Sequence, residues 1–199
     1  IVPIGDWVLN EACQQLSKWQ ESDLSKVSLA INLSLQQIQT DDFVEKIQSV
    51  IQKYSINPEL LELEITESIA MQDPDMIIDK LTQLKQLGVK LSIDDFGTGY
   101  SSLMYLKQLP VDTLKIDRNF VMNLETDEND VQIVSATISL AHNLGILVVA
   151  EGVEKQYHVD FLRQHECDYL QGYHFSKPMP LQDIKGYIKN SGGEHATLV

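Results

Sequence analysis

Short apolar runs alternate with amphipathic segments along the chain, and this alternation is the feature that most limits its possible folds. The candidate strands are VSLAIN, LLELEITE, VKLSID, DTLKID, ILVVAE and CDYLQ, and stretches with helical spacing of apolar residues separate them. About six strand–helix units, whose strands read as mostly apolar on both faces, are typical of a parallel sheet covered by helices. The pattern therefore predicts an α/β domain with one parallel sheet.

Residues that favour helix ends mark several of the expected helices. Asp6 is expected to cap a helix through DWVLNEACQQLSKWQE. Asp73, followed by Pro74, is expected to cap DPDMIIDKLTQLKQLG, which ends at Gly88. A long helix is expected over residues 127–143.

Length and charge exclude some classes of protein. A chain of 199 residues, 43% of them hydrophobic, is large enough for one domain with one substantial core. The net charge of −14 argues against binding to duplex nucleic acid or an anionic membrane, although metal ions could still recruit a small phosphorylated ligand. No run approaches the roughly 18–20 apolar residues of a membrane helix, and no signal peptide is visible. Cys13 and Cys167 are expected to be free thiols in a reducing compartment, the cytoplasm.

Polar side chains gather at the C-terminal ends of the candidate strands. They are Asn32, Glu64, Glu67, Asp94, Asp95, Lys115, Asp117, Glu151, Glu154 and Gln171. In parallel α/β barrels the C-terminal strand ends meet on one face, where the active site is built. If the six strands belong to one barrel, these polar groups converge on one small volume.

Each of these residues also has a purely structural explanation, and taken singly these explanations stay open. Asn32 could cap the next helix, and Lys115 could be an outward surface residue. Glu151 and Glu154 could charge the first turn of the helix that follows them, and a glutamate of LELEITE could form an ordinary ion pair. The glycines of FGTGY could merely permit a tight turn.

As a set, these groups predict a site for divalent cations. Four or five carboxyl or carboxamide groups at one place would destabilise the fold unless cations neutralised them. The candidate ligands are all oxygens, which selects Mg²⁺ or Mn²⁺ over a structural zinc ion. The neighbouring Asp94 and Asp95 suit two ions, because one carboxylate can bridge while the other binds the second ion. Paired metals about 4 Å apart are a standard device for phosphodiester hydrolysis.

Six motifs in order along the chain resemble those of EAL domains, the phosphodiesterases that hydrolyse the bacterial second messenger cyclic di-GMP. They are AINLS, LELEITES, SIDDFGTGYSSL, LKIDRNFV, AEGVE and YLQGYHFSKPMP. The resemblance runs from Ile1 to about Pro180 and implies a modified TIM (β/α)₈ barrel that releases linear pGpG. It also implies sensory or GGDEF-type domains elsewhere in the parent protein, whose membrane tethering stays open.

The resemblance implies a role for each matching residue. The implied metal ligands, for Mg²⁺ or Mn²⁺, are Asn32, Glu64, Asp94, Asp95 and Glu151. Lys115 is implied to orient or activate the attacking water, Glu151 to bind metal or accept a proton, and Gln171 to lie near the water and substrate. Glu154 and Asp117 are supporting residues. Calcium is expected to inhibit, because a larger ion with looser geometry positions the water poorly.

The segment after the aspartate pair is implied to couple dimerisation to metal binding. It spans Phe96, Gly97, Thr98 and Gly99 and continues to residue 102, and Glu67 is implied to brace it. A homodimer is therefore expected.

The Glu-Ala-Leu signature of the family is absent, and the one Glu-Ala pair, Glu11–Ala12, lies in the first expected helix. The family carries its signature on a strand upstream of Ile1, so the chain is expected to lack the first part of the barrel. One metal-ligand glutamate and one ligand-contacting arginine would be missing with it. The expected EAL-type domain is residues 1–190, followed by a flexible tail at 191–199. Because an incomplete barrel exposes two strand edges, we expect low stability or pairing with a second copy.

Two functional interpretations follow from these residues. The first is a cyclic di-GMP phosphodiesterase, with the activity of this truncated chain left open. The alternative is a receptor that binds cyclic di-GMP without cleaving it. Degenerate receptors would be expected to lose acidic ligands, so the full set of carboxylates in the downstream motifs favours the enzyme.

Overall fold

A computed structural model describes residues 1–99 and 103–190 of the chain. Within these residues, six strands form one sheet in the order β1-β2-β3-β4-β5-β6, and every neighbouring pair is parallel. The strands are β1 (Leu29–Asn32), β2 (Leu61–Thr66), β3 (Lys90–Phe96), β4 (Thr113–Ile116), β5 (Leu147–Ala150) and β6 (Tyr169–Leu170). Spatial order that equals chain order is the arrangement of a barrel wall.

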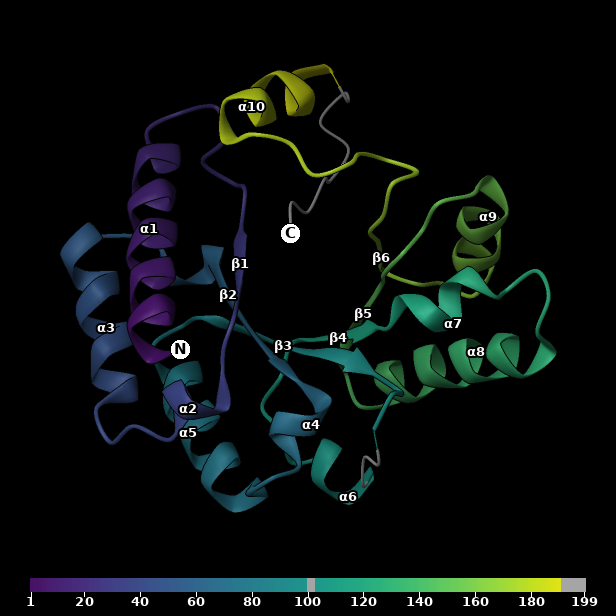
Figure 1. Ribbon diagram of the computed structural model, residues 1–199, viewed down its shortest axis with the longest axis horizontal. Coiled ribbons are helices and arrows are strands. Elements are labelled where there is room, and N and C mark those ends of the chain that lie inside the picture. Colours follow the sequence, from purple (N-terminus) through teal and green to yellow (C-terminus); the bar gives the residue numbers. More distant parts are fainter. Residues whose placement is uncertain (100–102, 191–199) are drawn as a thin grey trace.

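Helices connect and cover the strands. They are α1 (Val2–Gln20), α2 (Leu35–Ile38), α3 (Phe43–Tyr54), the 3₁₀ turn η1 (Pro58–Leu60), α4 (Glu67–Ala70), α5 (Pro74–Gln86), α6 (Leu103–Leu106), α7 (Arg118–Met122), α8 (Glu128–Asn143), α9 (Gln156–Gln164) and α10 (Leu181–Asn190). Figure 1 shows the strands curving around the centre, with α1, α3, α5 and α8 outside them. The six strands form a half-barrel, which confirms the predicted α/β fold of the TIM-barrel type.

Strand β2 shows how the sequence builds a wall with two different faces. Leu61, Leu63 and Ile65 are buried in the hydrophobic core, and they alternate with Glu62 and Glu64. Because successive side chains of a strand point to opposite faces, one face is apolar and the other is polar. The expectation that the strands are apolar on both faces is therefore wrong for β2. Its polar face carries a residue of the site described below.

The predicted end of one long helix and the starts of two are confirmed. The Oδ1 of Asp73 accepts a hydrogen bond from the Met76 amide at 3.3 Å, and Gly88 beyond the end of α5 has a φ of +90°. The Oδ1 of Asp127 accepts from the Asn129 amide at 2.8 Å at the start of α8. These side chains satisfy amide groups that a helix leaves unpaired at its N-terminus.

The expectation that Asp6 caps the first helix is wrong. Helix α1 begins at Val2, because Pro3 favours the first helical turn, and Asp6 lies within the helix. Its carboxylate lies 3.9 Å from the ammonium of Lys46, which also pairs with Asp42 at 3.1 Å. Asp6 therefore joins α1 to α3 rather than starting α1.

Three further expectations concern the whole chain. Cys13 and Cys167 are free thiols, as predicted. No helix in the described part of the chain is both long and apolar enough to cross a bilayer. The predicted flexible tail, residues 191–199, lies outside the described residues.

Candidate active site

Three carboxylates from three neighbouring parts of the sheet converge on Lys115. The Lys115 Nζ lies 3.0 Å from Glu64 Oε1, 3.2 Å from Asp94 Oδ1 and 2.8 Å from Glu151 Oε1. Glu64 lies on β2, Asp94 on β3 and Lys115 on β4, and Glu151 directly follows β5. Strand ends that are distant in the sequence therefore meet at one point, as the polar pattern predicts. Lys115 is only 3% exposed, which excludes an outward surface role.

The charged groups of the cluster shift one another's pKa values. Burial by itself would lower the pKa of Lys115, but the carboxylates of Glu64, Glu151 and Asp94 outweigh it and raise the pKa above its usual value. Lys115 is therefore an ammonium ion. Burial raises the pKa of Glu64 and of Glu151, and the attraction of Lys115 only partly offsets it. One buried ammonium does not balance this much negative charge.

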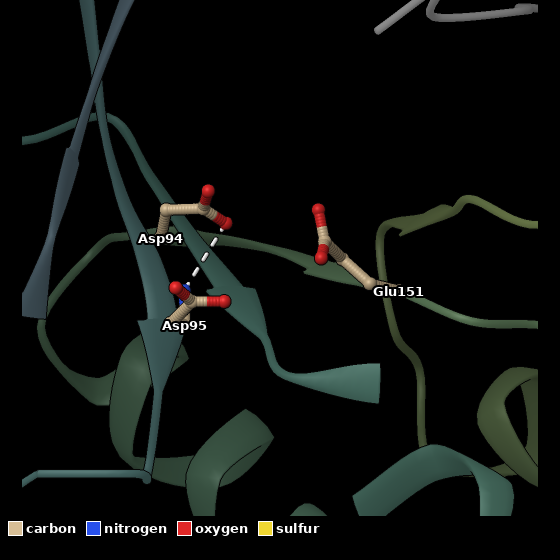
Figure 2. Close-up of side chains that lie close together, drawn as sticks. All are labelled: Asp94, Asp95 and Glu151. Carbon is tan, nitrogen blue, oxygen red and sulfur yellow. Dashed lines mark hydrogen bonds between the residues drawn. The ribbon is translucent and has the colours of Figure 1, made fainter. Parts of the chain in front are cut away.

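The backbone at Asp95 explains how two adjacent aspartates share one side of the sheet. In a regular strand their side chains would point to opposite faces. Here the register between β3 and β4 shifts between Ile93 and Phe96, and Asp95 has a φ of +55°. Figure 2 shows the carboxylates of Asp94 and Asp95 lying on the side that Glu151 faces. Such a bulge in the left-handed region is the kind of local strain that occurs at functional sites.

The donor set fits a hard divalent cation. Asp94, Asp95 and Glu151 each offer a carboxylate oxygen, and these three oxygens lie within 4.8 Å of one another. Burial raises the pKa of Asp95, and the neighbouring Asp94 and Asp117 carboxylates raise it further, so the site gains from added positive charge. Oxygen donors of this kind suit Mg²⁺ or Mn²⁺.

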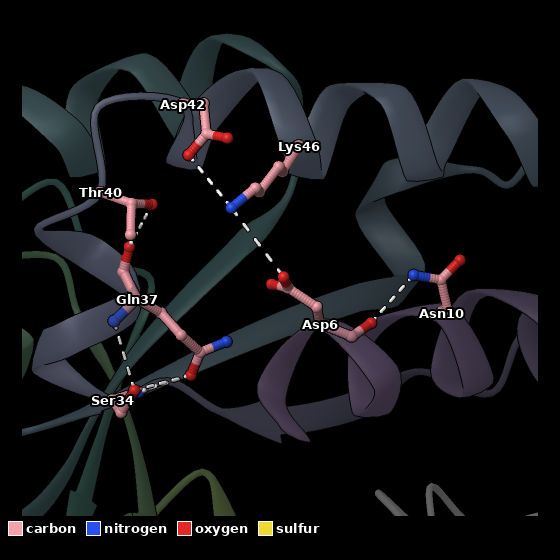
Figure 3. A network of polar contacts seen from close by, with 7 residues as sticks. All are labelled: Asp6, Asn10, Ser34, Gln37, Thr40, Asp42 and Lys46. Carbon is pink, nitrogen blue, oxygen red and sulfur yellow. Dashed lines mark hydrogen bonds and ion pairs between the residues drawn. The ribbon is translucent and has the colours of Figure 1, made fainter. Parts of the chain in front are cut away.

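Asn32 lies at the rim of the same sheet end. It is the last residue of β1 and stands in register with Glu64 on β2. The next helix is capped by Ser34, whose side chain forms a reciprocal capping box with Gln37 (Figure 3). The Leu33 amide donates to the Glu64 carbonyl at 2.8 Å. Asn32 is therefore not the helix cap, and its side chain is exposed.

Glu67 holds the segment that follows the aspartate pair. Its side chain is 2% exposed, and its Oε2 accepts from the amides of Gly97 at 2.8 Å and Gly99 at 3.2 Å. The Thr98 hydroxyl donates to the Asp95 carbonyl at 2.8 Å. The predicted bracing contact is thus present as far as Gly99, and residues 100–102 of the segment lie outside the described residues.

Comparison with known proteins shows the family. The EAL domain family matches residues 1–178. This chain belongs to the EAL domain family. The bifunctional diguanylate cyclase/cyclic di-GMP phosphodiesterase MucR of Pseudomonas aeruginosa is 45% identical over 184 residues, which are 92% of this chain and 27% of that protein. The cyclic di-GMP phosphodiesterase NbdA of the same species is 39% identical over 186 residues, 94% of this chain and 24% of that protein.

The solved structures agree with the fold of this EAL domain. The structure of the PaMucR phosphodiesterase in complex with c-di-GMP aligns with a TM-score of 0.89 at 44% identity, covering 92% of this chain and 74% of that chain. The EAL domain spans about a quarter of the length of the curated relatives named above.

Three further predicted residues of this EAL domain make no ion pair with Lys115 in the described part of the chain. The Gln171 Oε1 is buried and has no hydrogen-bond partner among the described residues. Asp117 is 7% exposed, and its Oδ1 accepts from the Asn119 amide at 2.8 Å at the start of α7. The Glu154 side chain is exposed. Helix α9 begins at Gln156 and has no acidic residue in its first turn, so the helix-charging explanation for the glutamates of AEGVE is wrong.

Sequence reasoning missed two features of the EAL domain site. One is the bulge at Asp95, for which the only local signals are an aspartate, a residue type that tolerates the left-handed region, and the glycine two positions later. The other is His158, a buried side chain on α9 whose Nδ1 accepts from the Glu154 amide at 3.3 Å. No motif in the sequence points to His158.

Proposed function

We propose that this EAL domain hydrolyses one phosphodiester bond of cyclic di-GMP and releases linear pGpG. The observation that carries the proposal is the convergence of Glu64, Asp94 and Glu151 on Lys115, beside Asp95, at one end of the parallel sheet. A relative 39% identical is named a cyclic di-GMP phosphodiesterase, and a solved relative 44% identical is a c-di-GMP complex. An acidic site can hold an anionic dinucleotide only if cations offset its charge.

The cations in this proposal are two Mg²⁺ or Mn²⁺ ions. The residues that would hold them are Asn32, Glu64, Asp94, Asp95 and Glu151. When bound, such ions neutralise the charge on the scissile phosphate and stabilise the attacking and leaving oxygens. The excess of carboxylates over ammonium groups in the cluster supports this assignment.

Three side chains of the EAL domain would act on the reacting groups. The Lys115 ammonium is buried and permanently charged, so it can stabilise negative charge that develops at phosphorus. Glu151 has a raised pKa, chiefly through burial, which moves it toward the range of an efficient proton acceptor. The unpartnered Oε1 of Gln171 can accept a hydrogen bond from a water molecule.

The direct test supplies cyclic di-GMP with Mg²⁺ or Mn²⁺ and measures pGpG. Two proteins are compared: the chain itself, and a chimaera that joins to Ile1 the residues preceding the matched region in the MucR phosphodiesterase. We expect turnover by the chimaera, and turnover by the chain alone would show that the described sheet suffices. Binding without turnover by either protein would identify a receptor instead. Absence of both binding and turnover would refute the proposal, and Ca²⁺ in place of Mg²⁺ should lower the rate.

Metal binding should depend on pH in a direction that the pKa shifts determine. The pKa values of Glu64, Asp95 and Glu151 are raised, and protons must leave these groups before a metal binds. We expect Mn²⁺ affinity to rise with pH above about 4.3, the ordinary glutamate pKa, and then to level off. Calorimetric titrations in two buffers of different ionisation enthalpy would measure the protons released. An affinity that does not rise at any pH above about 4.3 would contradict this expectation.

The EAL domain is also proposed to form a homodimer and to belong to a protein with sensory or GGDEF-type domains. Strands β1 and β6 are the two edges of the described sheet, and an open edge can pair with another chain. The named relatives are about four times as long as the aligned segment, and one is bifunctional. Light scattering after size exclusion tests the dimer, and a stable, well-folded monomer would count against it.

A further inference from the structure

His158 is a buried polar side chain that is not one of the groups paired with Lys115. It lies on α9 and is 1% exposed. Its Nδ1 accepts a hydrogen bond from the Glu154 amide at 3.3 Å, and its Nε2 is buried without a partner among the described residues. A ring nitrogen that accepts carries no proton, so the ring must be neutral, with its proton on Nε2.

The loop that His158 contacts is the one that carries Glu151. Residues 151–155 join β5 to α9, and their backbone groups bond to neighbouring elements. The Glu151 amide donates to the Ile116 carbonyl at 3.1 Å, and the Val153 amide donates to the Gln171 carbonyl at 2.9 Å. The Val153 carbonyl accepts from the His174 amide at 2.9 Å. The backbone of this loop is therefore anchored on both sides before it reaches Glu154.

Close packing leaves this loop little room to move. Gly152 has a φ of +69°, and a Cβ there would lie 2.6 Å from the Cβ of Arg118. A Cβ on Gly172 would lie 2.1 Å from the Val153 carbonyl oxygen. Both glycines allow two backbone segments to approach closely. The middle of the path from Glu151 to α9 is thus closely packed against neighbouring segments.

At the far end of the loop, the entrance to α9 has no ordinary cap. The N-cap residue is Lys155, which makes no side-chain cap hydrogen bond. His158 is the third residue of the helix and reaches back to the amide that precedes the N-cap. A capping box uses a side chain at the same helix position in a similar way. His158 therefore ties the start of α9 to the loop before it, although it does not cap the amides of the first helical turn.

We propose that His158 is a positioning residue for the active site, whose neutral imidazole holds the Glu154 amide and thereby fixes the loop that presents Glu151 to Lys115. The effect on catalysis rests on the proposed function. The effect on the loop rests only on the hydrogen bond between His158 and the Glu154 amide. Glu151 lies 2.8 Å from Lys115, and displacement of a catalytic group by about 1 Å can cost 100-fold in rate. Burial lowers the pKa of His158, which favours the neutral ring that can accept this bond.

The test uses two substitutions of similar size, of which only one keeps a hydrogen-bond acceptor. In His158→Asn, the side-chain oxygen can take the place of Nδ1, whereas His158→Leu has no acceptor. We expect His158→Leu to lose hydrogen-exchange protection at the Glu154 amide and to bind Mn²⁺ about 10-fold more weakly, and His158→Asn to keep both. His165→Leu is the matched control, because His165 is the C-cap at the opposite end of α9 and its ring contacts only the Phe161 carbonyl of its own helix among the polar groups described.

Several outcomes would overturn the proposal. Unchanged Mn²⁺ affinity in His158→Leu would make His158 a merely structural residue, and equal losses in both variants would show that the acceptor is not the cause. If His158→Leu does not fold, nitrogen NMR of the unmodified chain decides, since a proton on Nδ1 contradicts the hydrogen bond. A last outcome is that neither the unmodified protein nor any variant hydrolyses cyclic di-GMP, while Mn²⁺ binding is kept in His158→Asn and weakened in His158→Leu. In that case the proposed function fails and the positioning role stands.

Discussion

Asp94→Asn is expected to weaken Mn²⁺ binding by at least about 100-fold and to abolish release of pGpG. The substitution keeps the shape of the side chain but replaces a charged oxygen by a neutral one, in the group of three carboxylates that lie within 4.8 Å of one another. Substitutions of groups that only support metal ligands already cost about 10- to 100-fold, so loss of a ligand should reach at least the upper figure. Calorimetric titration with Mn²⁺ and chromatography of the product measure the two effects.

The fold of Asp94→Asn should survive, because Lys115 keeps Glu64 and Glu151 as partners. Asp75→Asn is the matched control: it removes one carboxylate from the exposed first turn of α5 and leaves the cluster intact. Mn²⁺ affinity in Asp94→Asn within twofold of the control would show that the cluster does not hold the metal.

Lys115→Met is expected to destabilise the metal-free protein by about 3–5 kcal/mol at neutral pH, the usual cost of removing one partner from a buried ion pair. Lys115 is the one cation within ion-pair distance of Glu64, Asp94 and Glu151 in the described part of the chain. Without it, the carboxylates repel one another at a site where the Glu64 side chain is 3% exposed and the other two are only partly exposed. Urea denaturation with and without Mn²⁺ measures the effect, and Mn²⁺ should stabilise the variant more than the unmodified protein.

A second substitution separates charge from packing in this result. Glu64→Gln in the Lys115→Met background removes one of the unbalanced carboxylates and should recover part of the lost free energy of unfolding. Failure to recover any of it would attribute the loss to the missing packing of the lysine side chain. Equal stability of Lys115→Met and the unmodified protein in metal-free buffer would contradict the charge argument altogether.

Much of the fold can be predicted from the sequence because interactions between nearby residues determine the strands and the helix ends. The six apolar runs correspond to the six strands, Asp73 caps α5 as predicted, and α8 starts after Asp127, where the long helix was expected. The polar residues at the strand ends could be identified because parallel strands place their C-terminal ends on one side. These features require only nearby residues and one rule of topology.

Other features depend on contacts between distant segments. Lys115 resembles a surface residue in its own strand, and only the register of three other strand ends makes it the centre of a buried cluster. The bulge at Asp95 arises from the pairing of β3 with β4, which local propensity does not encode. Pro3, rather than Asp6, determines the start of α1. Both residues favour a helix start, and the sequence pattern alone did not show which of them would do so. The individual roles of Asn32 and Gln171 stay predictions.

The central cluster takes one side chain from each of β2, β3 and β4 and one from the turn after β5. A folding intermediate that lacks any of these four elements would present an incomplete set of ligands. If the cluster holds a cation as proposed, only a molecule in which strands β2 to β5 have paired in order would bring all of its ligands to that ion. Binding of the cation during refolding would therefore report that strands β2 to β5 have paired. Helix content would not, because helices can form earlier.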